Sequence, residues 1–371
     1  MKKFLRCLLF LTVSVGLMLA FGERLQQWIV PYFPDPSHAS YGTSGRYGDS
    51  PAPDSDGDAV QSLLPDSSRA YYYSQLSENA KALYSAVFYQ CLPESGEADI
   101  RITLPQPVTV TKEEGESEDD FAARLARQIL ETFQPALDAL AYDHPEIDWI
   151  RMGEEDGSAF SYTTTHLPFS SDTATVTKIS FRLKCEERDG GIAAYCDRLL
   201  ETAASASIPD GLSRYDTLLL LQQALCERVS YCTDAPYAHE AAGALLYGQA
   251  VCDGYAKAFK LLCDENDIPC IVVPGKAFQY GSEEPHAWNY VQMENGLWYA
   301  IDTTWNDREG STADTRFFLV GKDTVTSYAL GSFSQSHLPS GSFSPVAYEP
   351  FRLPALSSER YLPESIPSEA A

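Results

Sequence analysis

The sequence predicts a mixed α/β (α+β) protein, in which a helix that begins at a cysteine packs on an antiparallel sheet. Apolar residues recur every three or four positions after Cys252, which is the period of an amphipathic helix. Further along, Asn295-Gly296 separates two runs rich in aromatic and β-branched residues, a strong signal for an antiparallel hairpin. Residues 70–200 contain helical and alternating patterns of their own, so we expect a smaller α/β domain before the main one.

The N-terminus has the form of an export signal. A basic start, Met1–Arg6, precedes an apolar run from Cys7 to Gly22. This run is somewhat shorter than the roughly 20 residues that span a bilayer, so we expect cleavage near Gly22, with retention as the alternative. We therefore assign 1–22 to a signal peptide or N-terminal anchor, and either outcome places the remaining chain outside the cytoplasm. Residues 23–69 follow as a flexible linker, largely rich in Pro, Ser, Gly and Asp.

The charge of the chain is strongly acidic. Its 371 residues include 27 Lys and Arg against 52 Asp and Glu, which gives a net charge of −25. Such a surface repels nucleic acid and anionic lipid. We therefore expect no nucleic-acid partner, and membrane contact only through the N-terminal anchor. No pattern in the sequence indicates an oligomeric state.

Residues 70–200 are predicted to form an N-terminal α/β accessory domain. Its helical patterns lie at about Leu76–Gln90 and at Phe121, Leu125, Ile129 and Phe133, and its alternating patterns lie at Ile100–Leu104 and Ile179–Leu183. We expect Pro135 to interrupt the second helix and a short further helix to end near Tyr142. The stretch Asp143-His144-Pro145-Glu146 is interpreted as a helix-ending turn rather than a metal site. We find no catalytic set of side chains here and hypothesise a support or recognition role.

The region 201–330 is predicted to be the catalytic domain. Its expected elements are a helix marked by Leu218, Leu221, Leu225 and Val229, the helix that begins at Cys252, a strand at Cys270–Val273 ended by Pro274-Gly275, a hairpin of His286–Met293 and Leu297–Asp302, and a strand at Phe317–Val320. The first helix should pack beside the Cys252 helix. Residues 331–371 are rich in Ser and Pro with isolated aromatic residues, and are expected to be an irregular C-terminal tail.

The loop of the hairpin decides which side chains share a face of the sheet. With a two-residue loop, Asp302 and His286 would point to opposite sides. With a three-residue loop, Met293 lies opposite Leu297, and Asp302 shares a face with His286 one diagonal step away. Gly296 suits the left-handed position that ends three-residue loops, and a diagonal neighbour lies roughly 5–8 Å away. We therefore predict the three-residue loop, or a bulge with the same effect.

Cys252 is the candidate nucleophile because it falls in the first turn of its helix. Unpaired N–H groups and the positive end of the helix dipole favour a thiolate at this position. His286 is the candidate base that takes the thiol proton. Asp302 would fix the tautomer of that imidazole and stabilise its cation.

The motifs that carry these three residues resemble the bacterial transglutaminase-like proteins. They occur in the family's order as Ala250-Val251-Cys252-Asp253-Gly254-Tyr255-Ala256, His286-Ala287-Trp288-Asn289 and Trp298-Tyr299-Ala300-Ile301-Asp302-Thr303-Thr304-Trp305. The resemblance covers about 205–320, and it implies a papain-like transglutaminase core with a Cys-His-Asp triad. Papain-type enzymes carry an oxyanion glutamine six residues before the nucleophile, where this chain has Leu246. Gln249 and Tyr231 are the two substitutes that we consider.

The predicted function is that of an extracytoplasmic, transglutaminase-like thiol enzyme acting on protein or peptide amides. The thiolate would attack the amide carbonyl, the backbone N–H of Cys252 would help to bind the oxyanion, and a thioester would be resolved by water or by an amine. We expect neither a cofactor nor a metal. The alternative is a non-catalytic envelope module for binding or scaffolding that keeps the fold, which Leu246 favours.

The remaining cysteines and histidines are assigned structural places. Buried, unbridged thiols are the expectation for the cysteines, with Cys226–Cys232 and Cys263–Cys270 as the disulfide alternatives, and no zinc-binding spacing is present. Surfaces or turns are expected for four of the histidines outside the triad, which are His144, His166, His239 and His337.

Overall fold

The computed structural model describes residues 69–90, 97–151, 159–166, 172–206, 208, 211–279, 282–308, 313–326, 331–341 and 348–363. The predicted signal peptide or anchor at 1–22, and the predicted linker apart from Arg69, lie outside the described residues. Among the helices of these ranges, none is long and apolar enough to cross a membrane.

The described elements are a mixture of helices and strands along the chain. The helices are η2 (Tyr73–Gln75), α3 (Glu78–Gln90), α4 (Glu118–Asp143), α5 (Ile192–Ala204), α6 (Arg214–Arg228), α7 (Ala241–Leu245), α8 (Cys252–Asp264), α9 (Thr303–Asn306) and α10 (Phe333–Ser336). The strands are β2 (Glu97–Thr111), β3 (Ile150–Arg151), β4 (Ala159–His166), β5 (Thr173–Cys185), β6 (Ser230–Tyr231), β7 (Gln249–Ala250), β8 (Cys270–Gln279), β9 (Ser282–Gln292), β10 (Trp298–Ile301) and β11 (His337–Pro339).

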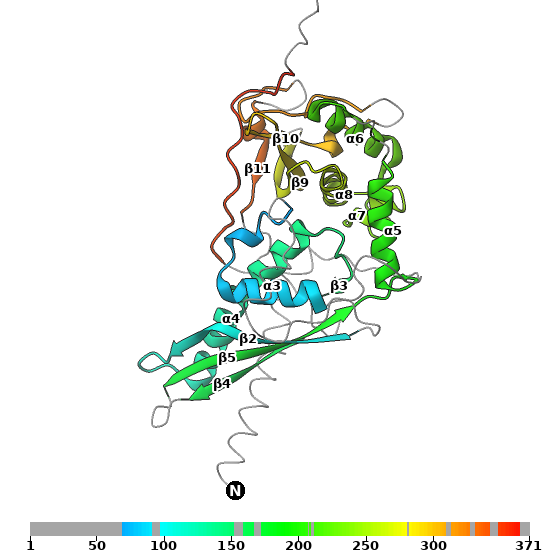
Figure 1. Ribbon diagram of the computed structural model, residues 1–371. Helices are drawn as coiled ribbons and strands as arrows, with labels where there is room; N and C mark the ends of the chain where they lie inside the picture. Colours follow the sequence, from blue (N-terminus) through cyan, green and yellow to red (C-terminus); the bar gives the residue numbers. More distant parts are fainter. Residues whose placement is uncertain are drawn as a thin grey trace, which may run out of the picture.

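The N-terminal half is built on an antiparallel sheet in which β5 is central. Strand β5 pairs with β2 on one side and with β3 and β4 on the other. Helix α3 packs against both β2 and α4 (Figure 1). The alternation expected at Ile100–Leu104 and Ile179–Leu183 lies on two long paired strands, β2 and β5, and α3 packs on β2.

Helix α4 corrects the prediction that Pro135 interrupts its helix. A single helix runs from Glu118 to Asp143 with Pro135 inside it. A proline in a helix interior costs about 3 kcal/mol or more through a lost hydrogen bond and a clash. The buried face continues on both sides of the proline, from Phe133 to Ala136 and Leu140. We infer that burial of this face outweighs the local penalty.

The C-terminal half contains a four-stranded antiparallel sheet with the order β10-β9-β8-β11 (Figure 1). Helix α8 packs on β8 and β9, and α6 and α7 pack beside α8. The predicted apolar face of α8 is buried, with Tyr255 and Phe259 completely covered and Leu262 nearly so. The fold class is therefore the predicted one: a mixed α/β protein in which a helix that begins at a cysteine lies on an antiparallel sheet.

The hairpin of β9 and β10 has the predicted three-residue loop. Trp298 pairs with Gln292 and Ile301 pairs with Asn289, which is the register that places Leu297 opposite Met293. The amide of Met293 donates to the carbonyl of Leu297 at 3.0 Å. Gly296 has a φ of +76°, so it takes the left-handed position for which glycine was expected.

Strand β8 does not end at Pro274-Gly275, as the sequence predicted, but continues to Gln279. Pro274 has no N–H to donate, yet its carbonyl accepts the amide of Ser340 at 2.8 Å. Gly275 is needed because β11 passes very close: a Cβ there would lie 2.3 Å from the carbonyl oxygen of Leu338. The proline and glycine therefore permit close pairing with β11 instead of ending the strand.

The strand expected at Phe317–Val320 is reduced to an isolated bridge between Val320 and Ala300. Leu319 has a φ of +49°, which takes the chain out of the extended conformation. Burial of this apolar run, rather than regular pairing, accounts for its composition.

The segment expected to be an irregular tail contains two regular elements. Residues 333–336 form α10, which opens with a capping box between Ser332 and Gln335. Residues 337–339 form β11, which adds a fourth strand to the sheet beside β8. This strand brings a histidine into the site described below.

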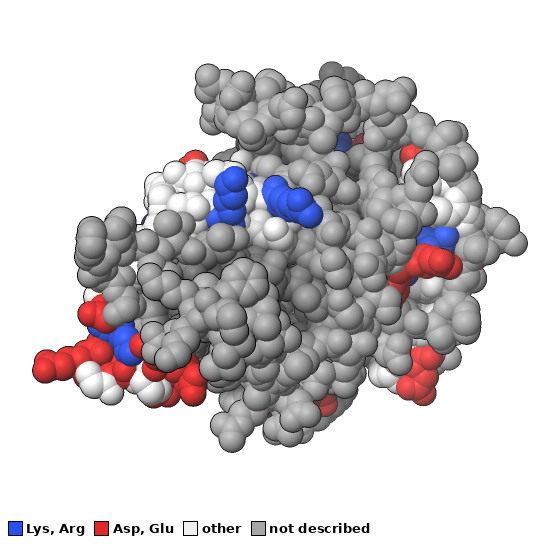
Figure 2. Space-filling model, turned by 90° about the horizontal axis from the view of Figure 1, so that it is seen from below, with Lys and Arg blue, Asp and Glu red and all other residues white. Residues whose placement is uncertain are grey.

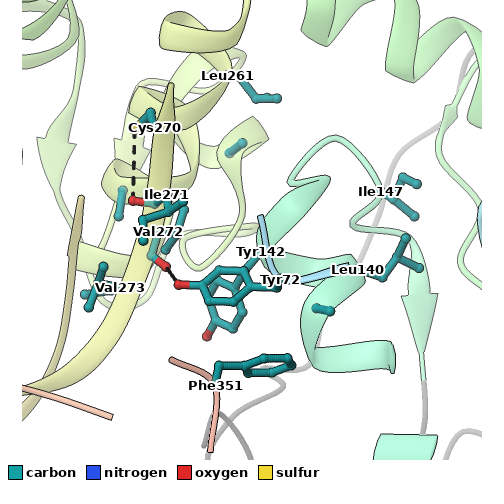
Figure 3. Packing of buried hydrophobic residues seen from close by; sticks show 14 of the residues in the cluster. Tyr72, Leu140, Tyr142, Ile147, Leu261, Cys270, Ile271, Val272, Val273 and Phe351 are labelled. Carbon is teal, nitrogen blue, oxygen red and sulfur yellow. Dashed lines mark hydrogen bonds between the residues drawn. The ribbon is translucent and has the colours of Figure 1, made fainter. Parts of the chain in front are cut away.

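The two halves share one buried cluster of apolar side chains. The hydroxyl of Tyr72 donates to the carbonyl of Val272 in β8 at 2.6 Å, and Leu140 and Phe351 belong to the same cluster (Figure 3). The amides of Tyr72 and Tyr73 donate to the carboxylate of Asp143 at 3.0 and 2.8 Å. The start of the described chain is thereby tied both to the end of α4 and to strand β8.

His144 lies in a turn, as expected, but this turn after α4 is buried and not at the surface. This residue is 5% exposed and ends the helix as its C-cap. Its Nδ1 lies 2.9 Å from Oε1 of the buried Glu146. The predicted helix-ending turn is confirmed, but its side chains face inward.

Acidic side chains are visible on the face seen from below. Figure 2 shows the described Asp and Glu residues mainly near the edges of this face, with Lys and Arg side chains beside some of them and others nearer the middle.

Candidate active site

Cys252 lies at the first position of α8, as its motif predicted. The N-cap residue, Val251, makes no side-chain hydrogen bond to the helix, and the thiol is partly exposed. The first N–H groups of a helix have no partner within it, and the helix dipole adds positive potential there. The position therefore suits a thiolate.

The loop before α8 is packed tightly against its first turn. The amide of Val251 donates to the carbonyl of Ala238 at 2.9 Å. A Cβ at Gly254 would lie 2.4 Å from that carbonyl oxygen and 3.0 Å from the carbonyl oxygen of Glu240. Glycine at this position of the Cys-Asp-Gly-Tyr motif therefore lets the loop approach, and the approach fixes the place of Cys252.

Asn289 links α8 to the sheet beneath it. The side chain is completely buried, and its Nδ2 donates to the carbonyl of Ala256 in α8 at 2.9 Å. Asn289 lies in β9, three residues after His286. The bond therefore holds the helix that carries the thiol against the strand that carries the imidazole.

His286 and Asp302 meet directly. The Nε2 of His286 lies 2.8 Å from Oδ2 of Asp302, and the two residues are 8% and 0% exposed. Asp302 follows β10 and is the N-cap of α9, where its Oδ1 accepts the amide of Trp305 at 3.0 Å. The hairpin register accounts for this meeting, because it places both side chains on one face.

The protonation of the pair follows from its surroundings. Burial lowers the pKa of His286, but the charge and hydrogen bond of Asp302, and a hydrogen bond and charge from Cys252, raise it to about 10. Burial raises the pKa of Asp302, but the imidazoles of His286 and His337 hold it well below its usual range. Near neutral pH the pair is therefore an imidazolium beside a carboxylate, and the imidazolium is hydrogen-bonded to the sulfur of Cys252.

His337 is a component of the site that the sequence analysis assigned to a surface or turn, and that assignment was wrong. The residue is 1% exposed, and its Nε2 lies 3.1 Å from Oδ2 of Asp302. Its Nδ1 lies 2.9 Å from the hydroxyl oxygen of Ser336. No local pattern marks this histidine, since it reaches Asp302 through the pairing of β11 with β8.

Of the two substitutes considered for the oxyanion glutamine, Tyr231 is the one placed near the thiol. Burial, together with the negative charges of Cys252 and Glu284, raises the pKa of Tyr231. Tyr231 pairs with Ala250, two residues before the thiol, and its side chain is 56% exposed. Gln249 is exposed on β7, and Leu246 has no polar group to offer.

Three side chains in the described part of the chain come close enough together to hold a metal ion. They are His286, Asp302 and His337, whose ligand atoms lie within 4.8 Å of one another. Both imidazoles already bond the same carboxylate oxygen. Hydrogen bonding therefore accounts for the cluster, and the arrangement suits proton transfer.

Neither disulfide alternative is realised. Cys226, Cys232, Cys263 and Cys270 are all unbridged. Burial and the neighbouring charges of Asp307, Asp302 and Glu227 raise the pKa of Cys226. Cys226 is therefore a buried thiol that stays protonated, whereas Cys252 is partly exposed.

Comparison with known proteins finds a family match for the part of the chain that carries these residues. Residues 203–303 match the model of the transglutaminase-like superfamily. This part of the chain is a transglutaminase-like domain. The match includes Cys252, His286 and Asp302, and it begins in the last turn of α5.

Solved structures similar to the chain are remote. A transglutaminase (TGase) has 12% identity and a TM-score of 0.27, covering 57% of this chain and 54% of its own, so the chain spans about half of that protein. A proposed cysteine protease from Cytophaga hutchinsonii has 13% identity and a TM-score of 0.26, covering 56% of this chain and 75% of its own. The periplasmic domain of TgpA from Pseudomonas aeruginosa has 16% identity and a TM-score of 0.19, covering 40% of this chain and 62% of its own. No curated protein sequence matches the chain.

Proposed function

We propose that the transglutaminase-like domain is an extracytoplasmic thiol enzyme that acts on protein or peptide amides, with Cys252, His286 and Asp302 as its triad. The observation that supports this most strongly is the buried contact of His286 with Asp302 beside a thiol at a helix N-terminus. A core cysteine gains nothing from that position, whereas a nucleophile is activated by it.

The reaction begins with the proton of Cys252 on His286. The thiolate attacks the amide carbonyl carbon, and a C–S bond forms as the carbonyl electrons move to oxygen. The backbone N–H of Cys252 binds that oxyanion, and the hydroxyl of Tyr231 is the second donor that we assign. The C–N bond then breaks, and the imidazolium of His286 gives its proton to the leaving amine.

The thioester is resolved by water or by a second amine. His286 takes a proton from that nucleophile as it attacks the thioester carbonyl, and the C–S bond breaks to return the thiolate. Asp302 remains ionised throughout and holds the imidazole with Nε2–H toward itself. Water gives hydrolysis or deamidation, and an amine gives acyl transfer.

The extracytoplasmic location is part of the proposal. It rests on the basic and apolar start of the chain, which has the form of an export signal. Fusion of residues 1–30 to a reporter that is active only outside the cytoplasm tests it. An active reporter supports export, and an inactive reporter contradicts it.

Alkylation with iodoacetamide at mildly acidic pH tests the activation of the thiol. We expect fast labelling confined to Cys252, and loss of that labelling in His286→Ala. Cys232 is the internal control, since it is the other partly exposed cysteine among the described residues. Slow labelling of both cysteines at similar rates would contradict the enzyme.

The second candidate function is a non-catalytic envelope module for binding or scaffolding. It is favoured by Leu246, which stands where papain-type enzymes carry the oxyanion glutamine. Incubation with a glutamine-containing peptide and hydroxylamine separates the two candidates. A hydroxamate product that requires Cys252 supports the enzyme, and fast alkylation without any product favours the binding module.

A further inference from the structure

Asp302 receives hydrogen bonds from two histidines at one oxygen. Oδ2 lies 2.8 Å from Nε2 of His286 and 3.1 Å from Nε2 of His337. The other oxygen, Oδ1, accepts the amide of Trp305 at 3.0 Å. A buried carboxylate is costly unless it is paired and hydrogen-bonded, and the imidazole of His337 is one of these three partners.

The protonation state of His337 follows from its neighbours. Burial lowers the pKa of His337 despite its bond to Asp302, so the ring is neutral near neutral pH. A carboxylate can only accept, so Nε2 must carry the proton of this neutral ring. Nδ1 is then unprotonated and lies 2.9 Å from the hydroxyl oxygen of Ser336, which also lies 3.1 Å from the carbonyl oxygen of Phe333, so its single proton has two acceptors within reach. The bond to Asp302 therefore fixes the tautomer.

The surroundings of His337 are aromatic and hold the ring in place. Phe333 stacks on it at 4.1 Å between ring centroids, and Trp305 and Trp288 lie edge-on at 4.6 and 5.0 Å. A buried packing histidine would show the same contacts, so the polar bonds are the distinguishing feature. The test must therefore distinguish the effect of the packed ring of His337 from the effect of its Nε2–H donor.

The titratable groups around His286, Asp302 and His337 come from helices α6 and α8 and from the sheet. Cys252 in α8 contacts His286, and Cys226 in α6 is close enough to Asp302 to feel its charge. The ring centroids of His286 and His337 are 5.8 Å apart. Each of the two imidazoles can influence the other through the carboxylate that they share.

The pairing of β11 with β8 places His337 beside Asp302. His337 pairs with Ala277 in β8, and Pro339 pairs with Gly275, whose own partner in β9 is His286. Both histidines thus enter the site from strands that flank β8. The absence of a side chain at Gly275 lets β11 lie this close.

We propose that His337 is a positioning residue, which holds the carboxylate of Asp302 so that the imidazole of His286 keeps its Nδ1 toward Cys252. This inference rests on the proposed function of the triad. The C-terminal segment is then part of the active site, although it lies beyond the region 203–303 that matches the family. His337 acts through Asp302 and does not touch the substrate.

Two substitutions separate the N–H from the ring. His337→Phe keeps an aromatic ring among the surrounding aromatic side chains but removes both nitrogens. His337→Gln keeps an N–H donor that reaches about as far as Nε2. The measurement is the rate of Cys252 alkylation by iodoacetamide as a function of pH, with the midpoint of thermal unfolding recorded for each variant.

We expect His337→Phe to lower the alkylation rate at mildly acidic pH roughly tenfold and to raise the acid-side midpoint by about one pH unit. His337→Gln should recover most of this loss. A purely structural histidine would change the unfolding temperature and leave the midpoint in place, so an unchanged midpoint in His337→Phe overturns the proposal. If that variant does not fold, Ser336→Ala decides, because it removes the partner of Nδ1 and should shift the midpoint in the same direction.

A second measurement keeps this inference apart from the proposed function. The far-downfield proton NMR signal of Nε2–H in His286 reports its bond to Asp302 and needs no reactive thiol. We expect the signal in the wild type and in His337→Gln, and its loss or broadening in His337→Phe. Slow wild-type alkylation together with this pattern would contradict the enzyme and support the positioning role. An identical signal in all three proteins would overturn the positioning role.

Discussion

Replacing Asp302 with Asn perturbs the atom around which the site is arranged. The amide of Trp305 donates to one carboxylate oxygen, and the N–H groups of His286 and His337 point at the other. If the amide oxygen of Asn keeps the bond from Trp305, its NH2 group faces both imidazoles. His286 must then turn Nε2 into an acceptor and carry its proton on Nδ1, where it can no longer accept the proton of Cys252.

The substitution also removes the negative charge of Asp302, and this adds to the effect of the wrong tautomer of His286. The pKa of His286 is about 10 rather than 6.5, and the charge of Asp302 is the largest cause that raises it. At about 1.4 kcal/mol for each pH unit, the imidazolium is stabilised by on the order of 5 kcal/mol in total. Without the imidazolium, a thiol with a pKa of about 8.5 is ionised in only roughly one molecule in 300 near pH 6. We therefore expect alkylation of Cys252 to slow by up to roughly 300-fold under these conditions.

The assay is the rate of carbamidomethylation at Cys252, followed by mass spectrometry at mildly acidic pH. Asp307→Asn is the matched control, because Asp307 lies five residues further along and bonds the hydroxyl of Tyr255. The control should keep the wild-type rate. An Asp302→Asn protein that folds and is alkylated as fast as the wild type would refute the reasoning.

Three further predictions concern stability. His286 has a folded pKa of about 10 against an ordinary value of 6.5, so its contribution to the free energy of unfolding is complete below pH 6.5 and is lost as the pH rises through 10. Urea unfolding at a series of pH values should show this loss of stability in the wild type and not in His286→Ala. Gly275→Ala should destabilise the protein by about 1–3 kcal/mol, because the new methyl group overlaps the backbone of β11, and wild-type stability would contradict the close approach. Tyr72→Phe leaves a buried carbonyl of β8 without its 2.6 Å bond, and should cost about 1–3 kcal/mol in a denaturant titration; the 44% exposed Tyr247, changed to Phe, is the control that should cost little.

Sequence patterns were sufficient where local chemistry decides the structure. The periodicity after Cys252 identified α8 and its first residue, and the strand period of two with Gly296 in the loop fixed the hairpin register. That register was enough to bring His286 and Asp302 to one face. The chemistry of these residues stays a proposal, but their meeting was predictable from spacing.

The errors lie where distant contacts override local preference. Pro135 was expected to break a helix, and continuous burial of α4 keeps it whole. Pro274-Gly275 was expected to end a strand, and pairing with β11 continues it instead. His337 could not be found from the sequence, because 35 residues separate it from Asp302 and only the tertiary pairing of β11 joins them.

Direct titration of His286 by NMR tests the central claim, which is that a buried carboxylate holds this imidazole in its charged form beside the thiol. We expect His286 to stay protonated through neutral pH and to titrate near 10. Titration at or below its ordinary value of 6.5 would contradict the account, because burial would then outweigh the bond to Asp302.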